Sequence, residues 1–288
     1  MVGIHKILVL VENPATSTDS FRHLIQKAAW LARRFDAEIM LLHAISVFSY
    51  PSGWLEGGHE ITVKDSQAPA VQDLQNDLDR AYLPELDGIA VTRVFGRGDS
   101  GREIIETARN LKVDLVVMSA HGYRWETKRV LREIPCPVWT GAHLEEAGSA
   151  EFSIRNVPCS MELNEHSRHT VLVAAGIAAA VDAQLTLVHI TDSVERFDPG
   201  GSHIDPVLKA QSAGLATEEI ARLQHHLGTT AEVIIDSGSK VLELLNRAAE
   251  QSGADVLIIG HIPSRSHTGD NGNGFGIIQS SLIPVLSV

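Results

Sequence analysis

The residues with the clearest chemical potential lie in a glycine-rich segment near the end of the chain. Gly260 and His261 follow an apolar run, and Gly272, Gly274 and Gly276 come shortly afterwards. Glycines let backbone N–H groups approach a phosphate closely, and the start of a following helix adds a favourable potential. The segment could therefore bind an anion. The competing interpretation is a flexible glycine loop that leads into a last helix.

Two further residues join this candidate site because they follow other apolar runs. Glu162 ends the run 157–162, and His189 ends the run 184–189. Ligands of open parallel sheets bind beyond the carboxyl ends of the strands, where the strand order reverses. We therefore expect Glu162 and His189 to border the same cleft as Gly260. For His189, a purely structural role at a strand end is the alternative.

The chain repeats this pattern about 145 residues apart. In each half one apolar run ends in glutamate, a second ends in histidine, a third contains aspartate and the last begins with proline. The pairs are 7–12 and 157–162, 38–43 and 184–189, 113–118 and 254–259, and 137–139 and 284–286. A repeat of this length indicates two domains rather than a solenoid. We place them at residues 1–146 and 151–288, with 142–152 as the linker.

The repeated runs must act as strands that position the site residues. Uninterrupted apolar runs of strand length are typical of strands buried on both faces. We predict strands at 7–11, 38–45, 91–95, 114–118, near 138, 157–161, 184–190, 232–235, 255–259 and 284–288. Helical spacing predicts helices at 21–35, 71–82, 104–111, 167–182, 206–227 and 239–252. The alternation predicts an α/β fold with parallel sheets. Pro158, in a central strand, predicts a later strand start or a bulge.

Composition excludes several classes of function. The formal net charge of -12 disfavours broad contact with nucleic acid or anionic lipid, since both need a basic face. Two cysteines form no disulfide framework. The longest apolar run, 170–181, is too short to span a bilayer, and the first residues have no signal-peptide layout. We therefore expect a cytoplasmic protein that binds neither membrane nor nucleic acid.

Seven segments together resemble a known family. They are Lys6–Glu12, Ala37–His43, Val113–Gly122, Val130–Val138, Ala183–His189, Ala254–His261 and Ile283–Val288. In this order they resemble the universal stress protein family in its tandem form. The resemblance implies two flavodoxin-like, Rossmann-like open parallel five-stranded sheets of order 3-2-1-4-5. It also implies an intrachain pseudo-dimer through the last strand of each domain. The resemblance leaves open whether two chains also associate as a homodimer.

The resemblance implies that members of this family divide into those that bind ATP and those that do not, and that the ATP-binding members share a sequence motif. Binders have Gly-x-x-Gly, nine residues, then Gly-Ser or Gly-Thr, with an aspartate after the first strand. In the first half Ser119 replaces the first glycine, Gly122 matches the second, and the spacer is missing. Glu12 replaces the aspartate. The first domain is therefore expected to lack a phosphate cradle.

The second half keeps more of the pattern. Gly260 matches the first glycine, Pro263 replaces the second, and Gly272 falls on the final pair. Glu162 again replaces the aspartate. The expected nucleotide-binding residues are Glu162, His189, Gly260, His261, Gly272, Gly274 and Gly276.

Three functions remain open from the sequence. The first is a non-enzymatic stress-response module whose second domain binds ATP or another adenine nucleotide. The second is an interaction protein whose loops 46–66 and 264–273 recognise a partner or another small ligand. The third is a slow ATP hydrolase, for which no catalytic residue is identified. No motif with metal-ligand spacing stands out among the 14 histidines. Asp99 and the segment 236–238 are expected to form turns with helix caps.

Overall fold

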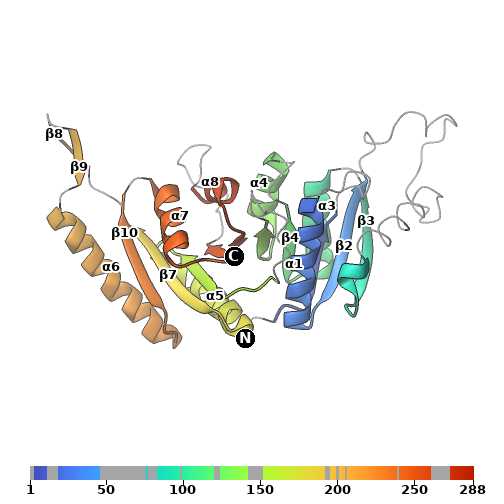
Figure 1. Cartoon of the computed structure of the whole chain (residues 1–288). Helices are drawn as coiled ribbons and strands as arrows, with labels where there is room; N and C mark the ends of the chain where they lie inside the picture. Colours follow the sequence, from blue (N-terminus) through green and yellow to red (C-terminus); the bar gives the residue numbers. More distant parts are fainter. Residues whose placement is uncertain are drawn as a thin grey trace. The chain divides into compact units, whose positions relative to one another are not determined.

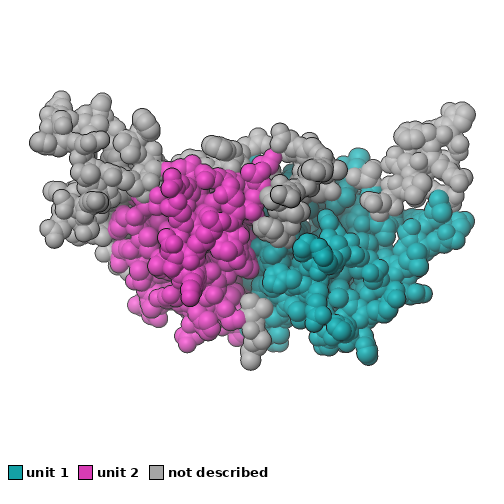
Figure 2. Space-filling model, turned by 180° about the vertical axis from the view of Figure 1, so that it is seen from behind, with its two compact units in different colours: residues 1–2, 142–144, 153–288 teal, residues 3–141, 145–152 magenta. Residues whose placement is uncertain are grey.

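The computed structural model describes two compact units, each considered by itself. It describes residues 3–11, 19–45, 76, 83–97, 99–119, 124–141, 152–191, 195–198, 201–204, 206–238, 240–260 and 273–288. The N-terminal unit comprises residues 3–141 and 145–152, and the C-terminal unit comprises 1–2, 142–144 and 153–288. Figure 2 colours the N-terminal unit magenta and the C-terminal unit teal.

The N-terminal unit alternates strands and helices around one parallel sheet (Figure 1). Its elements are β1 (Lys6–Leu10), α1 (Asp19–Phe35), β2 (Glu38–Ile45), the 3-10 helix η3 (Leu83–Leu86), β3 (Val91–Arg97), α3 (Ser100–Leu111), β4 (Leu115–Met118), α4 (Arg124–Glu133) and β5 (Val138–Thr140). The strand order is β3-β2-β1-β4-β5, and every pair is parallel. The expected order 3-2-1-4-5 is confirmed. The helix predicted at 71–82 lies outside the described residues except for residue 76.

The C-terminal unit repeats this order. Its elements are β6 (Asn156–Ser160), α5 (Ser167–Val181), β7 (Gln184–Thr191), β8 (Glu195–Asp198), β9 (Gly201–Ile204), α6 (Pro206–Leu227), β10 (Glu232–Ser237), α7 (Val241–Gln251), β11 (Leu257–Ile259), α8 (Asn273–Ser280) and β12 (Val285–Ser287). The order β10-β7-β6-β11-β12 is again parallel. The sequence analysis did not predict the antiparallel β8–β9 hairpin.

The two central strands explain why uninterrupted apolar runs were the strongest sequence signal. Ile7, Leu8 and Val9 of β1 are fully buried, as are Val157 and Cys159 of β6. Helices cover both faces of a parallel sheet, so consecutive side chains are buried alternately on opposite sides. The core of each unit is therefore built around its first strand.

Pro158 gives a different result from the one expected. β6 begins at Asn156, and Pro158 pairs in register with Thr186 of β7. On the other side of β6, pairing with β11 begins only at Cys159. Proline cannot donate a ladder hydrogen bond, so it is accommodated where that second ladder has not yet begun. The predicted late start or bulge was wrong.

Among the described residues, no helix is both long enough and apolar enough to cross a membrane.

Candidate functional site

The turn after β6 holds the predicted carboxylate at the carboxyl end of the C-terminal unit's sheet. Glu162 is exposed there, and its Oε2 accepts a hydrogen bond from Asn164 Nδ2 at 3.2 Å. Between them Leu163 has a φ of 53°, in the left-handed region that a bulky residue rarely adopts. Backbone strain of this kind is often found where a functional side chain is held in position.

Asn164 then organises the start of α5. Its Oδ1 accepts from His166 N at 2.9 Å, and its backbone N–H donates to Ser167 Oγ at 2.9 Å. The N-cap residue of α5, His166, makes no side-chain capping bond. The sequence analysis did not identify Asn164 as a site residue, although an asparagine shortly before a helix is a recognisable turn signal.

Gly260 lies on the neighbouring strand end, close to the same helix. It follows β11, whose Ile259 pairs with Ser160 of β6. A Cβ added at Gly260 would lie 3.2 Å from Thr170 Oγ1 on α5, which is closer than ordinary packing. The absence of a side chain therefore lets the strand end approach the first turns of α5. The structure brings Gly260 and Glu162 to adjacent strand ends, as predicted.

His189 and its counterpart His43 have the same structural contact. The Nδ1 atom of His189 donates to Met161 O at 2.9 Å, and that of His43 donates to Val11 O at 3.1 Å. Both histidines are buried, at 8% and 6% exposure. Because Nδ1 is the donor, a neutral ring has Nε2 as its acceptor atom. This contact supports a role in tying the strand ends together, and a ligand role for His189 stays a prediction.

The remaining predicted residues fall on or before the last helix. Gly274 and Gly276 lie in the first turn of α8, so they are helical rather than part of a loop. A Cβ added at Gly276 would meet nothing within 4 Å. His261 and Gly272 lie outside the described residues, as do Glu12 and Gly122 of the first half. Their nucleotide-binding role stays a prediction.

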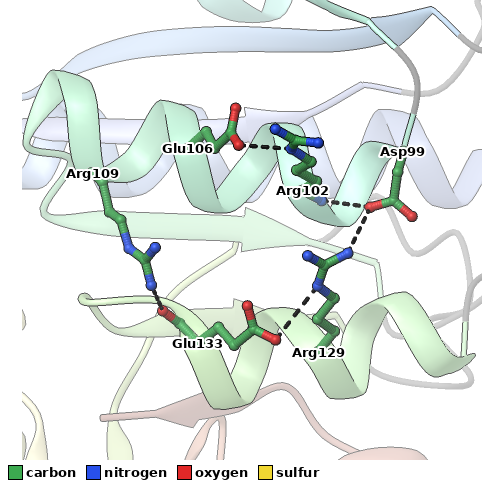
Figure 3. Close-up of polar contacts among 6 residues, drawn as sticks. All are labelled: Asp99, Arg102, Glu106, Arg109, Arg129 and Glu133. Carbon is green, nitrogen blue, oxygen red and sulfur yellow. Dashed lines mark hydrogen bonds and ion pairs between the residues drawn. The ribbon is translucent and has the colours of Figure 1, made fainter.

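In the N-terminal unit the carboxylate of Asp99 caps the start of α3, the helix that is the counterpart of α7 (Figure 3). Asp99 caps α3, where its Oδ1 accepts from Arg102 N at 2.7 Å and lies 3.4 Å from Arg129 Nη1. Arg129 also pairs with Glu133 at 3.5 Å, and Arg109 donates to Glu133 O at 2.8 Å. These contacts link α3 to α4 along the length of both helices. The expected Asp99 cap is confirmed.

The C-terminal unit lacks this cap. The N-cap residue of α7 is Lys240, and it makes no side-chain capping bond. Asp236 instead accepts from Ser237 N at 2.8 Å and pairs with Lys209 and Arg247 at 3.6 and 3.7 Å. The helix cap expected from segment 236–238 was therefore wrong.

A pair of hydroxyls lies beside this helix start, of which the sequence analysis included Ser237, in the segment 236–238, but not Thr191. Thr191 Oγ1 and Ser237 Oγ are 2.6 Å apart, at the carboxyl ends of β7 and β10. Both residues are 7% exposed, so the hydroxyls are held inside the protein. The signal that could have found them is their shared position at the ends of adjacent strands.

The two cysteines are poor nucleophiles. Burial raises the pKa of both thiols to about 12, and for Cys136 the charge of Asp114 adds to the effect. The reactive thiolate is therefore scarce near neutral pH. We predict that a colorimetric disulfide reagent at pH 8 labels native protein at least tenfold more slowly than guanidinium-unfolded protein. Rapid labelling of either native thiol would contradict this prediction.

Comparisons with known proteins agree with this architecture. The model of the universal stress protein family matches residues 3–140 and 154–272. The chain is similar to a universal stress protein from Pseudomonas aeruginosa UCBPP-PA14, with 17% identity, TM-score 0.63, and coverage of 99% of this chain and 93% of that one. For one from Archaeoglobus fulgidus DSM 4304 the values are 16%, 0.62, 98% and 95%. For a universal stress protein in complex with cAMP they are 21%, 0.35, 48% and 98%. No curated protein matches.

Proposed function

The chain belongs to the universal stress protein family, in tandem form, and we propose that its C-terminal unit binds an adenine nucleotide. The observation that supports this best is the juxtaposition of Glu162 and Gly260 at adjacent strand ends, beside the start of α5. A carboxylate there can accept from ribose hydroxyls. Glycine gives a ligand access to backbone N–H groups.

The difference between the two units also favours this unit. In the N-terminal unit Asp99 occupies the start of α3 with its own negative charge. In the C-terminal unit the N-cap residue of α7, the counterpart of α3, makes no side-chain capping bond. The first N–H groups of a helix without a cap can donate to water or to an anionic ligand. The nucleotide phosphates would take that role here.

The physiological role we propose is that of a cytoplasmic stress-response module rather than an enzyme. Nucleotide occupancy of the C-terminal unit would be its signal, and the N-terminal unit would be a structural partner. Pairing of the two units through their last strands stays a prediction from the family resemblance. A homodimer is a further prediction.

The test is equilibrium dialysis of the full chain with labelled ATP, ADP, AMP and cAMP. We expect binding of at least one nucleotide, weakened about 100-fold by Gly260→Val, because the larger side chain would displace Thr170. Gly214→Val is the matched control, since a Cβ at Gly214 meets nothing within 4 Å. Circular dichroism would check that each variant is folded.

Two results would overturn this proposal. Binding that survives Gly260→Val but is lost with Gly122→Val would place the site in the first half. The absence of a thermal shift with any of the four nucleotides would favour the interaction-protein alternative. A ligand present at 100 times its dissociation constant should stabilise the protein by about 2.7 kcal/mol.

A further inference from the structure

The side chain of Phe152, the last residue of the linker 142–152, packs against aromatic rings of the N-terminal unit. Its ring lies 5.1 Å from that of Trp30 on α1 and 6.5 Å from that of Trp139 in β5, between centroids. The interplanar angles are 82° and 83°, so both contacts are edge-to-face, an arrangement that aromatic pairs prefer to face-to-face stacking. Phe152 groups with the N-terminal unit, whereas the next residue, Ser153, belongs to the C-terminal unit.

A cation completes this contact. Lys27 lies three residues before Trp30 on α1, so the two side chains project from neighbouring positions on one face of the helix. The Nζ atom of Lys27 is 5.3 Å from the centroid of the Phe152 ring. An ammonium group at that distance is attracted by the negative face of the ring. Lys27, Trp30 and Trp139 together form an aromatic site, and Phe152 occupies it.

Phe152 stands outside the repeated fold of both units. β5 is the last element of the N-terminal unit. The repeat of the C-terminal unit begins at Ile154, because Ile4 and Ile154 both stand two residues before the first strand and are 5% and 2% exposed. The backbone N–H groups of Lys6 and Asn156 then each donate to an aspartate shortly before an adjacent strand. The contacts of Phe152 therefore come in addition to those that build either unit.

One feature of the aromatic site opposes its occupation by Phe152. Trp139 is 1% exposed, and its Nε1 atom has no hydrogen-bond partner among the described residues. A buried N–H group without an acceptor is costly, and water would satisfy it if the ring of Phe152 moved away. The attraction between the rings and the desolvation of this N–H group therefore act in opposite directions.

We propose that Phe152 is a latch that fixes the end of the linker to the N-terminal unit and that opens while both units stay folded. In this structure the latch is closed. When it opens, the end of the linker is released, and Trp30 and Trp139 become accessible to solvent. Phe152 is half-buried and Ser153 is exposed, so the ring can reach solvent without crossing the core of either unit.

The first test is tryptophan fluorescence of the full chain. The chain has four tryptophans, and the replacements Trp54→Phe and Trp125→Phe leave Trp30 and Trp139 as the reporters. In this background Phe152→Ala should shift the emission to longer wavelength. It should also raise the acrylamide quenching constant at least about threefold, because the buried indole loses its aromatic cover. An unchanged quenching constant would overturn the proposal.

Matched variants separate a latch from ordinary core packing. Phe152→Leu keeps an apolar side chain but loses the ring, and Lys27→Met keeps the apolar stem but loses the charge. Both should raise the quenching constant, though less than Phe152→Ala. Phe35→Leu, the same change at the far end of α1, should leave it unchanged. If Phe152→Ala and Phe152→Leu both lost the far-ultraviolet circular dichroism of the folded protein, Phe152 would be a core residue and the proposal would be overturned.

A nitroxide label at Ser153→Cys tests whether the latch opens in the otherwise unchanged protein. Burial raises the pKa of both native thiols to about 12, so the label reacts at position 153. We expect the electron paramagnetic resonance spectrum to contain an immobile and a mobile component. The mobile component should grow on heating before circular dichroism detects unfolding, and it should dominate in Phe152→Ala. A mobile component that appears only as the units unfold would overturn the proposal.

Discussion

Replacing Asp255 by alanine is expected to lower the free energy of unfolding of the C-terminal unit by about 2 kcal/mol. One carboxylate oxygen, Oδ2, accepts from Arg155 N at 2.7 Å and from Asn156 N at 2.9 Å. These two N–H groups stand where the chain enters the central strand β6. In the variant these N–H groups have no charged acceptor, so the start of β6 is no longer held to the chain just before β11. The effect should be large because hydrogen bonds to charged groups contribute more stability than bonds between neutral groups.

The repeat supplies a matched experiment for this prediction. Asp114 Oδ2 accepts from His5 N at 2.8 Å and from Lys6 N at 3.0 Å, so Asp114→Ala should cost the N-terminal unit a similar amount. Glu106→Ala removes only a surface ion pair and should change stability by less than about 0.5 kcal/mol. Urea unfolding followed by circular dichroism measures all three variants. If Asp255→Ala lowered the free energy of unfolding as little as Glu106→Ala does, the proposed role of Asp255 in holding the start of β6 would be refuted.

The sequence predicted the parallel sheets because their determinants are local. An uninterrupted apolar run such as 7–11, flanked by helices, predicts a strand buried in a parallel sheet. The same pattern occurs in both halves of the chain, which strengthens the prediction. The aspartates at 114 and 255 were visible as part of that repeat. Their role was not, because each bonds to a segment about 100 residues away in the chain. Contacts of that range depend on the completed fold.

The candidate site was predictable only in outline. Strand ends located Glu162 and Gly260, because parallel strands bring their carboxyl ends to one edge. The close approach of Gly260 to Thr170 depends on how α5 packs, which no spacing in the sequence specifies. Likewise the cap expected from segment 236–238 failed because Lys209 and Arg247, from two different helices, pair with Asp236. Tertiary ion pairs overrode a local turn preference.

Protonation of His43 is expected to make the N-terminal unit less stable in mild acid. Burial lowers the pKa of this histidine below its ordinary value of 6.5, and the hydrogen bond to Val11 O only partly offsets that effect. The folded protein therefore binds fewer protons than the unfolded chain below pH 6.5. The stability that neutral His43 contributes is complete above pH 6.5. It is lost as the pH falls from there through the lower folded pKa, with a slope of at most about 1.4 kcal/mol per pH unit.

The variant His43→Leu separates this contribution from those of other titrating groups. At pH 7.5 it should be less stable than the wild type by about 1–3 kcal/mol, since Val11 O loses its side-chain donor inside the protein. Near pH 5 the difference should shrink, because only the wild type must then charge a buried ring. Ile39→Val, a non-titrating change on the same strand, should show a difference that does not vary with pH. Urea unfolding from pH 5 to 8 measures the difference in free energy of unfolding between the wild type and each variant. A difference for His43→Leu that grows as the pH falls would contradict the assignment to His43.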